Sequence, residues 1–238
     1  GWPSLTLAGV PVLPQPRQLT VADGLPSNVV YGFDEDANGY LWLASSDGLA
    51  RYDGRNFRIW RIEDGLRDNQ IWAVHVDKRN RVWIGTGMAG LAMLDPARHQ
   101  FTFYDGARYP ELRGAAIWNI KSTDDGSIWF GTEMSGLYRL RPDGSLEHFA
   151  HRADDPRSLP DNAIYRLDVD TRGTLWIGTA DGAAHWTGND FERQAFPDGT
   201  AQIITRLTAD ADGSIWIGTS DDKLFRRDPS GHLSPHRW

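Results

Sequence analysis

Five short stretches of the chain share one hydrophobic pattern, in which a tryptophan stands between two apolar residues and small residues follow. They read LWLAS at 41–45, VWIGT at 82–86, IWFGT at 128–132, LWIGT at 175–179 and IWIGT at 215–219. Their central residues are Trp42, Trp83, Trp129, Trp176 and Trp216, and subtracting successive numbers gives steps of 41, 46, 47 and 40. A period of this length predicts a solenoid, a propeller or an array of repeated units.

The repeat extends well beyond the tryptophan. Numbered from that residue, the five copies align without a gap from position −14 to position +3. Apolar residues at −12 and −9, such as Val30 and Phe33, predict a first strand, and a reversal containing Asp and Gly leads into the tryptophan strand. A third and a fourth strand follow, at 49–53 and 57–60 in the first copy. Four short strands per unit predict the blade of a β-propeller.

The predicted fold is therefore an all-β propeller that follows a lead-in at 1–16 and an extra strand at 17–22. Its blades are expected at 28–60, 69–104, 115–149, 162–196 and 202–238. Because the tryptophan strand is apolar on both faces, neighbouring blades must cover it. The five tryptophans are thus predicted to be core residues between blades.

Composition narrows the function. The 238 residues carry a formal net charge of −7, which opposes binding to nucleic-acid phosphates. The sequence contains no run of 18 apolar residues, so no segment is predicted to span a membrane. The absence of cysteine excludes disulfides, thiolate catalysis and cysteine-ligated metals. The turn DEDANG at 34–39 imitates the start of a calcium loop, but its twelfth position is Ser45, so neither a metal nor a cofactor is predicted.

The repeats resemble a known family. Residues 23–54 read DGLPSNVVYGFDEDANGYLWLASSDGLARYDG, and 64–86 and 159–179 follow the same pattern, which is similar to the two-component regulator propeller repeat. The resemblance implies a periplasmic sensor domain that precedes a transmembrane segment and a histidine kinase or GGDEF diguanylate cyclase. Such repeats usually form seven blades, so the five visible here are expected to belong to a larger ring.

The ends of the repeat array bear on ring closure. The extra strand at 17–22 and a complete fourth strand in the last unit fit an open ring better than a closed one of five blades. An open arc exposes two apolar blade faces, and contiguous apolar surface drives association. Self-association or strand exchange is therefore expected.

Two sets of residues are candidates for ligand binding. The loops between blades and the turns between second and third strands offer a surface for a small polar ligand such as a sugar or peptide, and ordinary solvated loops are the alternative. This loop set is Arg67, Met88, Arg108, Tyr109, Glu111, Arg113, Glu133, Met134 and Arg157. First strands line a propeller axis, so a channel set is also possible, with hydrogen bonding between blades as the alternative. It consists of His75, Asn119, Lys121, Arg166, Asp168 and Arg206.

The function expected from these features is a non-catalytic sensor or ligand-binding domain. One alternative is a propeller enzyme of lyase or glycosidase type, for which His75, Lys121 and Asp168 would cluster in a sealed pocket. The other is a protein-interaction scaffold, which would carry a large apolar patch on the loop face.

Overall fold

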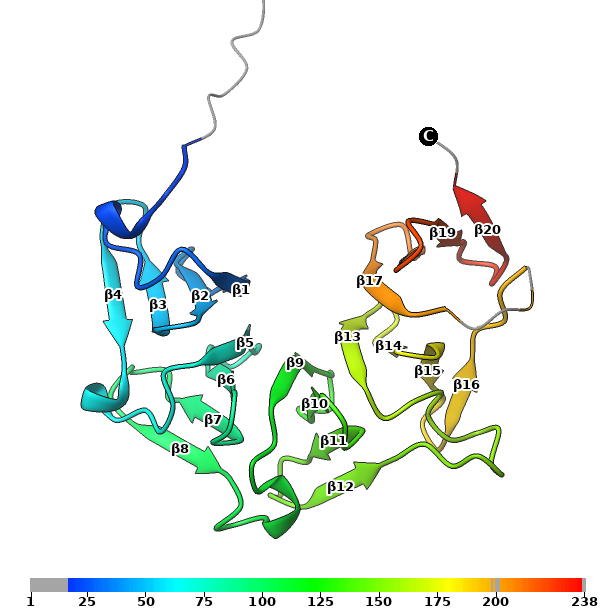
Figure 1. The fold of residues 1–238 in the computed structure, drawn as a ribbon, viewed down its shortest axis with the longest axis horizontal. Helices are drawn as coiled ribbons and strands as arrows, with labels where there is room; N and C mark the ends of the chain where they lie inside the picture. Colours follow the sequence, from blue (N-terminus) through cyan, green and yellow to red (C-terminus); the bar gives the residue numbers. More distant parts are fainter. Residues whose placement is uncertain (1–16, 198, 200–201, 237–238) are drawn as a thin grey trace, which may run out of the picture.

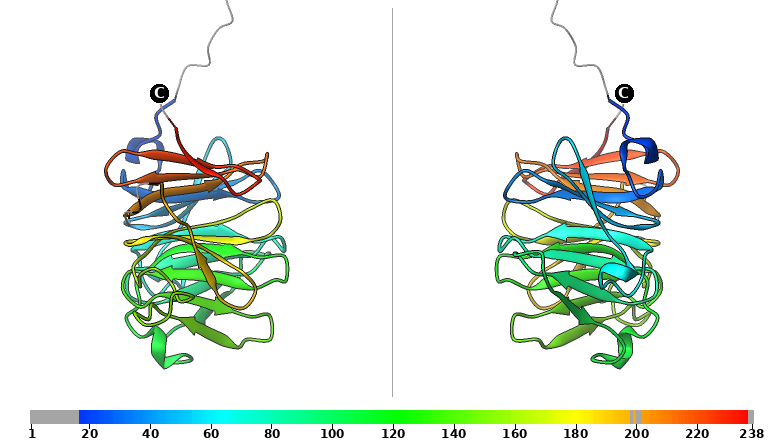
Figure 2. Two further views of the ribbon diagram at one scale, coloured as in Figure 1. Left: turned by 90° about the vertical axis from the view of Figure 1, so that its right-hand side faces the viewer. Right: turned by 90° about the vertical axis from the view of Figure 1, so that its left-hand side faces the viewer.

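The computed structural model describes residues 17–197, 199 and 202–236, and these form five antiparallel sheets of four strands each. The sheets pack side by side around a common axis, with the first strand of each sheet innermost and the fourth outermost (Figure 1). The two side views show one layer of sheets whose connecting loops lie on two opposite faces (Figure 2). The prediction of an all-β propeller with five visible four-stranded blades is confirmed.

Each blade runs outward in chain order from its first strand to its fourth. The strands of the first three blades are β1 (Val30–Glu35), β2 (Leu41–Ser45), β3 (Gly48–Tyr52) and β4 (Phe57–Trp60), then β5 (Ile71–Val76), β6 (Val82–Thr86), β7 (Leu91–Leu94) and β8 (Phe101–Tyr104), then β9 (Ile117–Ser122), β10 (Ile128–Thr132), β11 (Leu137–Leu140) and β12 (Leu146–Phe149). The last two blades contain β13 (Ile164–Val169), β14 (Leu175–Thr179), β15 (Gly182–Trp186) and β16 (Phe191–Arg193), then β17 (Ile204–Ala209), β18 (Ile215–Thr219), β19 (Leu224–Arg227) and β20 (Leu233–His236).

Three single 3-10 turns, η1 (Val21–Asp23), η2 (Ile62–Asp64) and η3 (Pro110–Leu112), are the only helical segments among the described residues. None of them is long or apolar enough to cross a membrane. The lead-in expected at 1–16 lies outside the described residues.

The strand predicted at 17–22 is wrong. Residues 17–20 have no regular structure, and η1 begins at Val21. The backbone N–H of Thr20 donates to Asp23 Oδ2 over 2.9 Å, and Gly24 follows in the left-handed region with φ of 100°. These local bonds close a turn instead of leaving the backbone free for a sheet. The same turn recurs at η2, between the first and second blades, so this segment is equivalent to the linker that enters the second blade.

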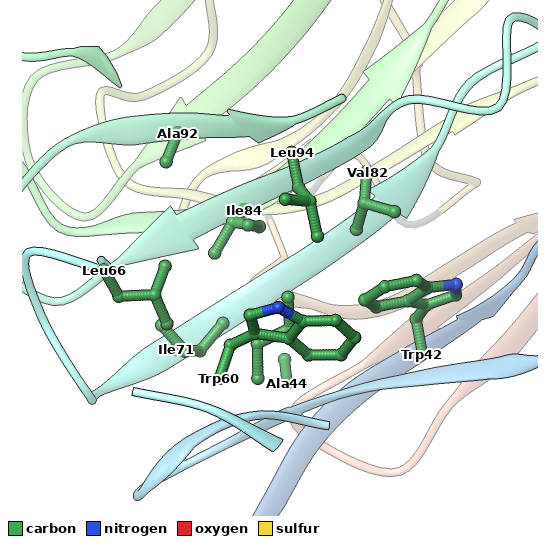
Figure 3. Packing of buried hydrophobic residues seen from close by; sticks show 10 residues of the cluster. Trp42, Ala44, Trp60, Leu66, Ile71, Val82, Ile84, Ala92 and Leu94 are labelled. Carbon is green, nitrogen blue, oxygen red and sulfur yellow. The ribbon is translucent and has the colours of Figure 1, made fainter. Parts of the chain in front are cut away.

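Four of the five central tryptophans fill the joints between blades, as predicted, whereas Trp216 of the last blade is partly exposed. In the first four blades their side chains are at most 1% exposed. Figure 3 shows Trp42 and Trp60 of the first blade packing against Ile71, Val82 and Ile84 of the second. Each central indole N–H also donates to the side chain at position −6 of its own blade, over distances of 2.8 to 3.4 Å. This residue is aspartate in four blades and threonine in the third.

A glycine two residues after the tryptophan makes room for the next blade. A Cβ atom placed on Gly178 would lie 2.6 Å from Cγ2 of Ile204, the residue at position −12 of the following blade. Gly85 faces Ile117 in the same way, and Gly131 faces Ile164. An alanine, Ala44, occupies this position in the first blade and is fully buried.

The two ends of the arc expose the halves of this same joint. In β1 the side chains of Val30 and Phe33 are 38% and 73% exposed, whereas the residues at position −12 of the other four blades are fully buried. At the other end, no residue of a following blade lies within 4 Å of a Cβ atom placed on Gly218, and Trp216 is partly exposed. The described part of the chain is therefore an open arc, with a gap between β1 and β17 (Figure 1).

Candidate functional site: the axial cavity

The first strands of the five blades surround a cavity of about 400 Å³ on the propeller axis. Its walls come from positions −11 to −8 of β1, β5, β9, β13 and β17, which lie innermost in Figure 1. The lining residues are Tyr31, Gly32, Phe33, Asp34, Trp72, Ala73, Val74, His75, Trp118, Asn119, Ile120, Lys121, Arg166 and Arg206. A volume of this size is typical of small-molecule sites, which range from about 300 to 1,000 Å³.

Aromatic side chains at position −11 form a continuous arc around the axis. The ring centroids of Tyr31 and Trp72 are 4.3 Å apart, those of Trp72 and Trp118 are 6.0 Å apart, and those of Trp118 and Tyr165 are 5.6 Å apart. The indole N–H of Trp118 has no acceptor among the described residues. Tyr31, Trp72 and Trp118 of this arc line the cavity and present partly exposed ring surface to it, which suits stacking against the flat or apolar face of a ligand.

The side chains at position −8 connect neighbouring blades around the axis. Asp34 Oδ2 lies 2.9 Å from His75 Nδ1 and accepts a 2.9 Å hydrogen bond from the backbone N–H of Val76. His75 Nε2 lies 2.8 Å from Ser122 Oγ of the third blade.

The ring of contacts continues through the last three blades. Lys121 Nζ lies 2.8 Å from Asp168 Oδ1, and Asp168 Oδ2 accepts from the backbone N–H of Ala209 over 2.8 Å. The carboxylates Asp34 and Asp168 thus have the same role, since each accepts from the backbone at position −7 of the next blade.

Hydrogen bonds set the acidity of Asp34. Burial alone would raise its pKa, but the bonds from His75 and from the backbone of Val76 outweigh burial and hold the pKa below its usual value. Asp34 is therefore ionised, and its carboxylate binds His75 and the backbone of the second blade.

Position −10 is different, because its charges have no carboxylate partners. Among the described residues, Arg166 and Arg206 form no salt bridge. Their Nη1 atoms donate only to backbone carbonyl groups, Tyr165 over 2.6 Å and Thr205 over 2.7 Å. Asn119 Nδ2 donates to the same Tyr165 carbonyl over 2.6 Å. Burial and then the charge of Arg206 lower the pKa of Arg166, so these two cations of adjacent blades repel each other beside the cavity.

The structure brings the channel set together and disperses the loop set. Five of the six channel residues line the axial cavity, and Asp168 is ion-paired to one of them, Lys121. Inter-blade bonding, the alternative interpretation, describes His75, Asn119, Lys121 and Asp168. It leaves the two arginines without a comparable structural role.

The loop set does not share one cavity, and none of its nine side chains lines the axial cavity. Arg67 lies over the ring of Phe103, with 4.0 Å from Cζ to the ring centroid, and is ion-paired with Asp105. Tyr109 donates from its hydroxyl to the Gly144 carbonyl over 2.8 Å.

The remaining loop residues are exposed or locally engaged. Arg108 lies over the rings of Tyr104 and Tyr109, and Arg157 is 3.3 Å from Asp190. Met88 and Met134 are 75% and 79% exposed, and Glu111, Arg113 and Glu133 are also on the surface.

Sequence reasoning missed the aromatic arc and Ser122. The signal for the arc was present, since an aromatic residue occupies position −11 in four consecutive copies. Ser122 lies at a position where the other copies have Glu, Val or Ala, so no pattern marked it.

Comparison with known proteins agrees with this arrangement. The family described as two component regulator propeller matches residues 24–47, 65–88, 158–181 and 198–221. Four of the five blades thus carry a two-component regulator propeller repeat, which spans their first two strands. The residues of the third blade lie outside the four matched ranges, although they carry the same strand pattern.

Among curated proteins, a histidine kinase of Formosa agariphila is 38% identical over 45 residues, which are 19% of this chain and 3% of the kinase. Among solved structures, the extracellular domain of a putative hybrid two component system from B. thetaiotaomicron has a TM-score of 0.70 at 23% identity. That match covers 87% of this chain and 27% of the other. The chain therefore spans only a small part of these relatives.

A propeller of another function has the same fold. The catalytically inactive H270A form of virginiamycin B lyase from Staphylococcus aureus has a TM-score of 0.72 at 14% identity, covering 89% of this chain and 71% of the lyase. At these identities the structural matches establish the fold alone.

Proposed function

We propose that this chain is the extracytoplasmic, ligand-binding sensor domain of a bacterial signal-transduction protein. A small polar ligand occupies the axial cavity, and its occupancy is relayed to a downstream histidine kinase or diguanylate cyclase. The repeat family supports this proposal, as do the short match to a histidine kinase and the fold shared with extracellular domains of two-component systems.

One observation carries the proposal above the others. The first strands of all five blades contribute aromatic, cationic and amide side chains to a single cavity of about 400 Å³. Aromatic surface with a few converging polar groups is the usual composition of a small-molecule site. Because every blade touches the cavity, a ligand there contacts several blades at once and stabilises their mutual arrangement, which is a physical route for a signal.

The test is a thermal-shift screen with neutral sugars, acidic sugars and short peptides. A ligand that binds only the folded chain at 100 times its Kd stabilises it by about 2.7 kcal/mol. Trp118→Ala, in the aromatic arc, is expected to abolish the shift, whereas Met134→Ala, on the exposed loop face, leaves it unchanged. A shift abolished by the loop variant and kept by the arc variant would contradict the proposed site.

A hydrolase is the second candidate, because Ser122, His75 and Asp34 follow one another in the order of a catalytic triad. The two contacts that join them are 2.8 Å and 2.9 Å long. The repeat pattern favours a structural role instead, since the equivalent Asp168 also accepts from position −7 of the following blade. Hydrolysis of an activated ester that is lost in Ser122→Ala but kept in Ser145→Ala would support the hydrolase. Equal residual rates would exclude it.

A further inference from the structure

We infer that the axial cavity selects a ligand that carries an oxyanion, and that Arg166 and Arg206 are the residues that recognise it. The ligand class that fits both walls of the cavity is an acidic sugar, with its carboxylate on the arginines and its ring on the aromatic arc. This inference rests on the proposed function and narrows it to one class of ligand.

The argument begins with uncompensated charge. The chain as a whole is acidic, with a formal net charge of −7, yet two guanidinium groups occupy the same position in adjacent blades beside one cavity. Like charges held close together in a partly buried place are unfavourable unless an anion joins them. Among the described residues, no carboxylate forms an ion pair with either arginine.

The carboxylates that line or adjoin the cavity are already engaged. Asp34 binds His75 and a backbone N–H, and Asp168 binds Lys121 and a backbone N–H. Rotation of either acid toward the arginines would break at least two contacts between blades. The two sides of the cavity therefore differ: the carboxylates at position −8 are engaged by groups of neighbouring blades, and the arginines at position −10 have no carboxylate partner among the described residues.

The geometry of the two guanidinium groups suits a planar oxyanion. Each has one nitrogen anchored by a backbone carbonyl, at 2.6 Å for Arg166 and 2.7 Å for Arg206, so its position is restrained while other N–H groups stay available. Arginine presents several donors in a fixed fork that matches a carboxylate or sulfate, which a lysine ammonium does not.

The aromatic arc adds a requirement for a ring. Tyr165 contributes the carbonyl that anchors Arg166, and its own ring stacks at 5.6 Å from Trp118. Tyr165 therefore connects two lining residues, Trp118 of the aromatic wall and Arg166 of the cationic wall. A ligand whose acid group is attached directly to a ring reaches both walls, whereas inorganic sulfate reaches only one.

The experiment is isothermal titration of the chain with glucuronate, glucose and sulfate. Glucuronate and glucose share the pyranose ring and differ in the carboxylate, and sulfate offers the anion without the ring. We expect glucuronate to bind more tightly than either. Because hydrogen bonds to a charged group are lost, Arg166→Gln and Arg206→Gln are each expected to weaken glucuronate roughly tenfold to a hundredfold.

Two further variants sharpen the comparison. Arg55→Gln removes the same charge from the exposed turn between β3 and β4 and should leave glucuronate binding unchanged. Arg166→Lys keeps the charge but loses the fork, so it should weaken binding as well. Arg206 is exposed and repels its neighbour, so Arg206→Gln should melt at or above the temperature of the parent without ligand. This melting control separates lost binding from lost folding.

Three results would overturn the inference. They are glucuronate that binds no better than glucose, glucuronate that binds equally to both arginine variants, and sulfate that binds as tightly as glucuronate. A neutral sugar or peptide that binds and is weakened by Trp118→Ala, but not by the arginine variants, would leave the sensor proposal standing and remove only the acidic-ligand inference. Absence of binding by every class would remove both.

Discussion

The blade joint predicts opposite outcomes for the same substitution at two equivalent glycines. In Gly178→Ala the new Cβ would lie 2.6 Å from Cγ2 and 3.0 Å from Cβ of Ile204, and ordinary carbon contacts are about 3.5 to 4.0 Å. The fifth blade must therefore shift away from the fourth. Overpacking of this kind costs about 1 to 3 kcal/mol. For a chain of this size that cost lowers Tm by about 2 to 12 °C.

Gly218→Ala is the matched control at the open end of the arc. Its Cβ meets only Arg206 of its own blade, at 3.1 Å, and Gly178 has the equivalent contact with Arg166 at 3.4 Å. No residue equivalent to Ile204 faces Gly218 among the described residues. Replacement of this strand glycine by alanine is therefore expected to leave the unfolding free energy unchanged or to raise it by about 0.5 to 1 kcal/mol. Ala44, which occupies this position natively, shows that a joint can be built around the extra methyl group.

The assay is urea denaturation of both variants at low micromolar concentration, followed by tryptophan fluorescence. At this concentration the end faces are expected to be free of association, so equal losses of stability would mean that the Gly218 face is covered within the single chain and that the arc is not open there. An unchanged Gly178→Ala would refute the joint itself.

Three further predictions concern the joints and the ends. Arg98 and Asp36 form a 3.1 Å ion pair between the first two blades, and both residues are buried. Arg98→Ala should therefore lower the unfolding free energy measured in urea by about 3 to 5 kcal/mol, and a loss below about 1 kcal/mol would contradict a stabilising role for the pair. Burial would raise the pKa of Asp36, Asp77 and Asp170, but indole and backbone donors outweigh burial and lower it. Their contribution is thus complete above the unfolded pKa of about 3.9 and is lost as pH falls below it, which thermal melts between pH 2 and pH 6 would detect as Tm falling only below about pH 4. We also propose that the exposed end faces associate, so size-exclusion chromatography with light scattering should show species above 26.7 kDa that Phe33→Glu converts to monomer; a strictly monomeric parent chain would exclude this.

The repeat made most of the fold predictable, and the ends show where prediction stopped. Spacing from the central tryptophan located the first two strands of every blade, because each copy confirms the others, and the turn and apolar pattern that follows predicted the third and fourth. The segment at 17–22 appeared only once in the strand interpretation, and its apolar residues gave no hint that Thr20 and Asp23 would close a turn. Its equivalent is the linker at Ile62–Asp64, and the DGL that ends both segments, at 23–25 and 64–66, was a sequence signal that the strand interpretation left unused.

The site was predictable in position but not in chemistry. Axial placement of position −10 and position −8 follows from strand order, and both interpretations of those residues were open. Which charges are balanced depends on distances across blades, such as Lys121 to Asp168, that no single repeat contains. The loop set shares predicted exposure and mixed charge, and these features do not specify whether its side chains converge. In the structure Arg67 pairs with Asp105, and the Tyr109 hydroxyl donates to the Gly144 carbonyl.

The most direct test of the account is fluorine NMR of the chain labelled with 5-fluorotryptophan, titrated with the ligand that gives the largest thermal shift. Resonances are assigned by single Trp→Phe replacements. If the ligand binds in the axial cavity, the fluorine resonances of Trp72 and Trp118 should shift, and those of the blade-joint residues Trp83, Trp129 and Trp176 should not. Shifts confined to the joint tryptophans, or binding that moves neither Trp72 nor Trp118, would contradict a ligand site on the propeller axis.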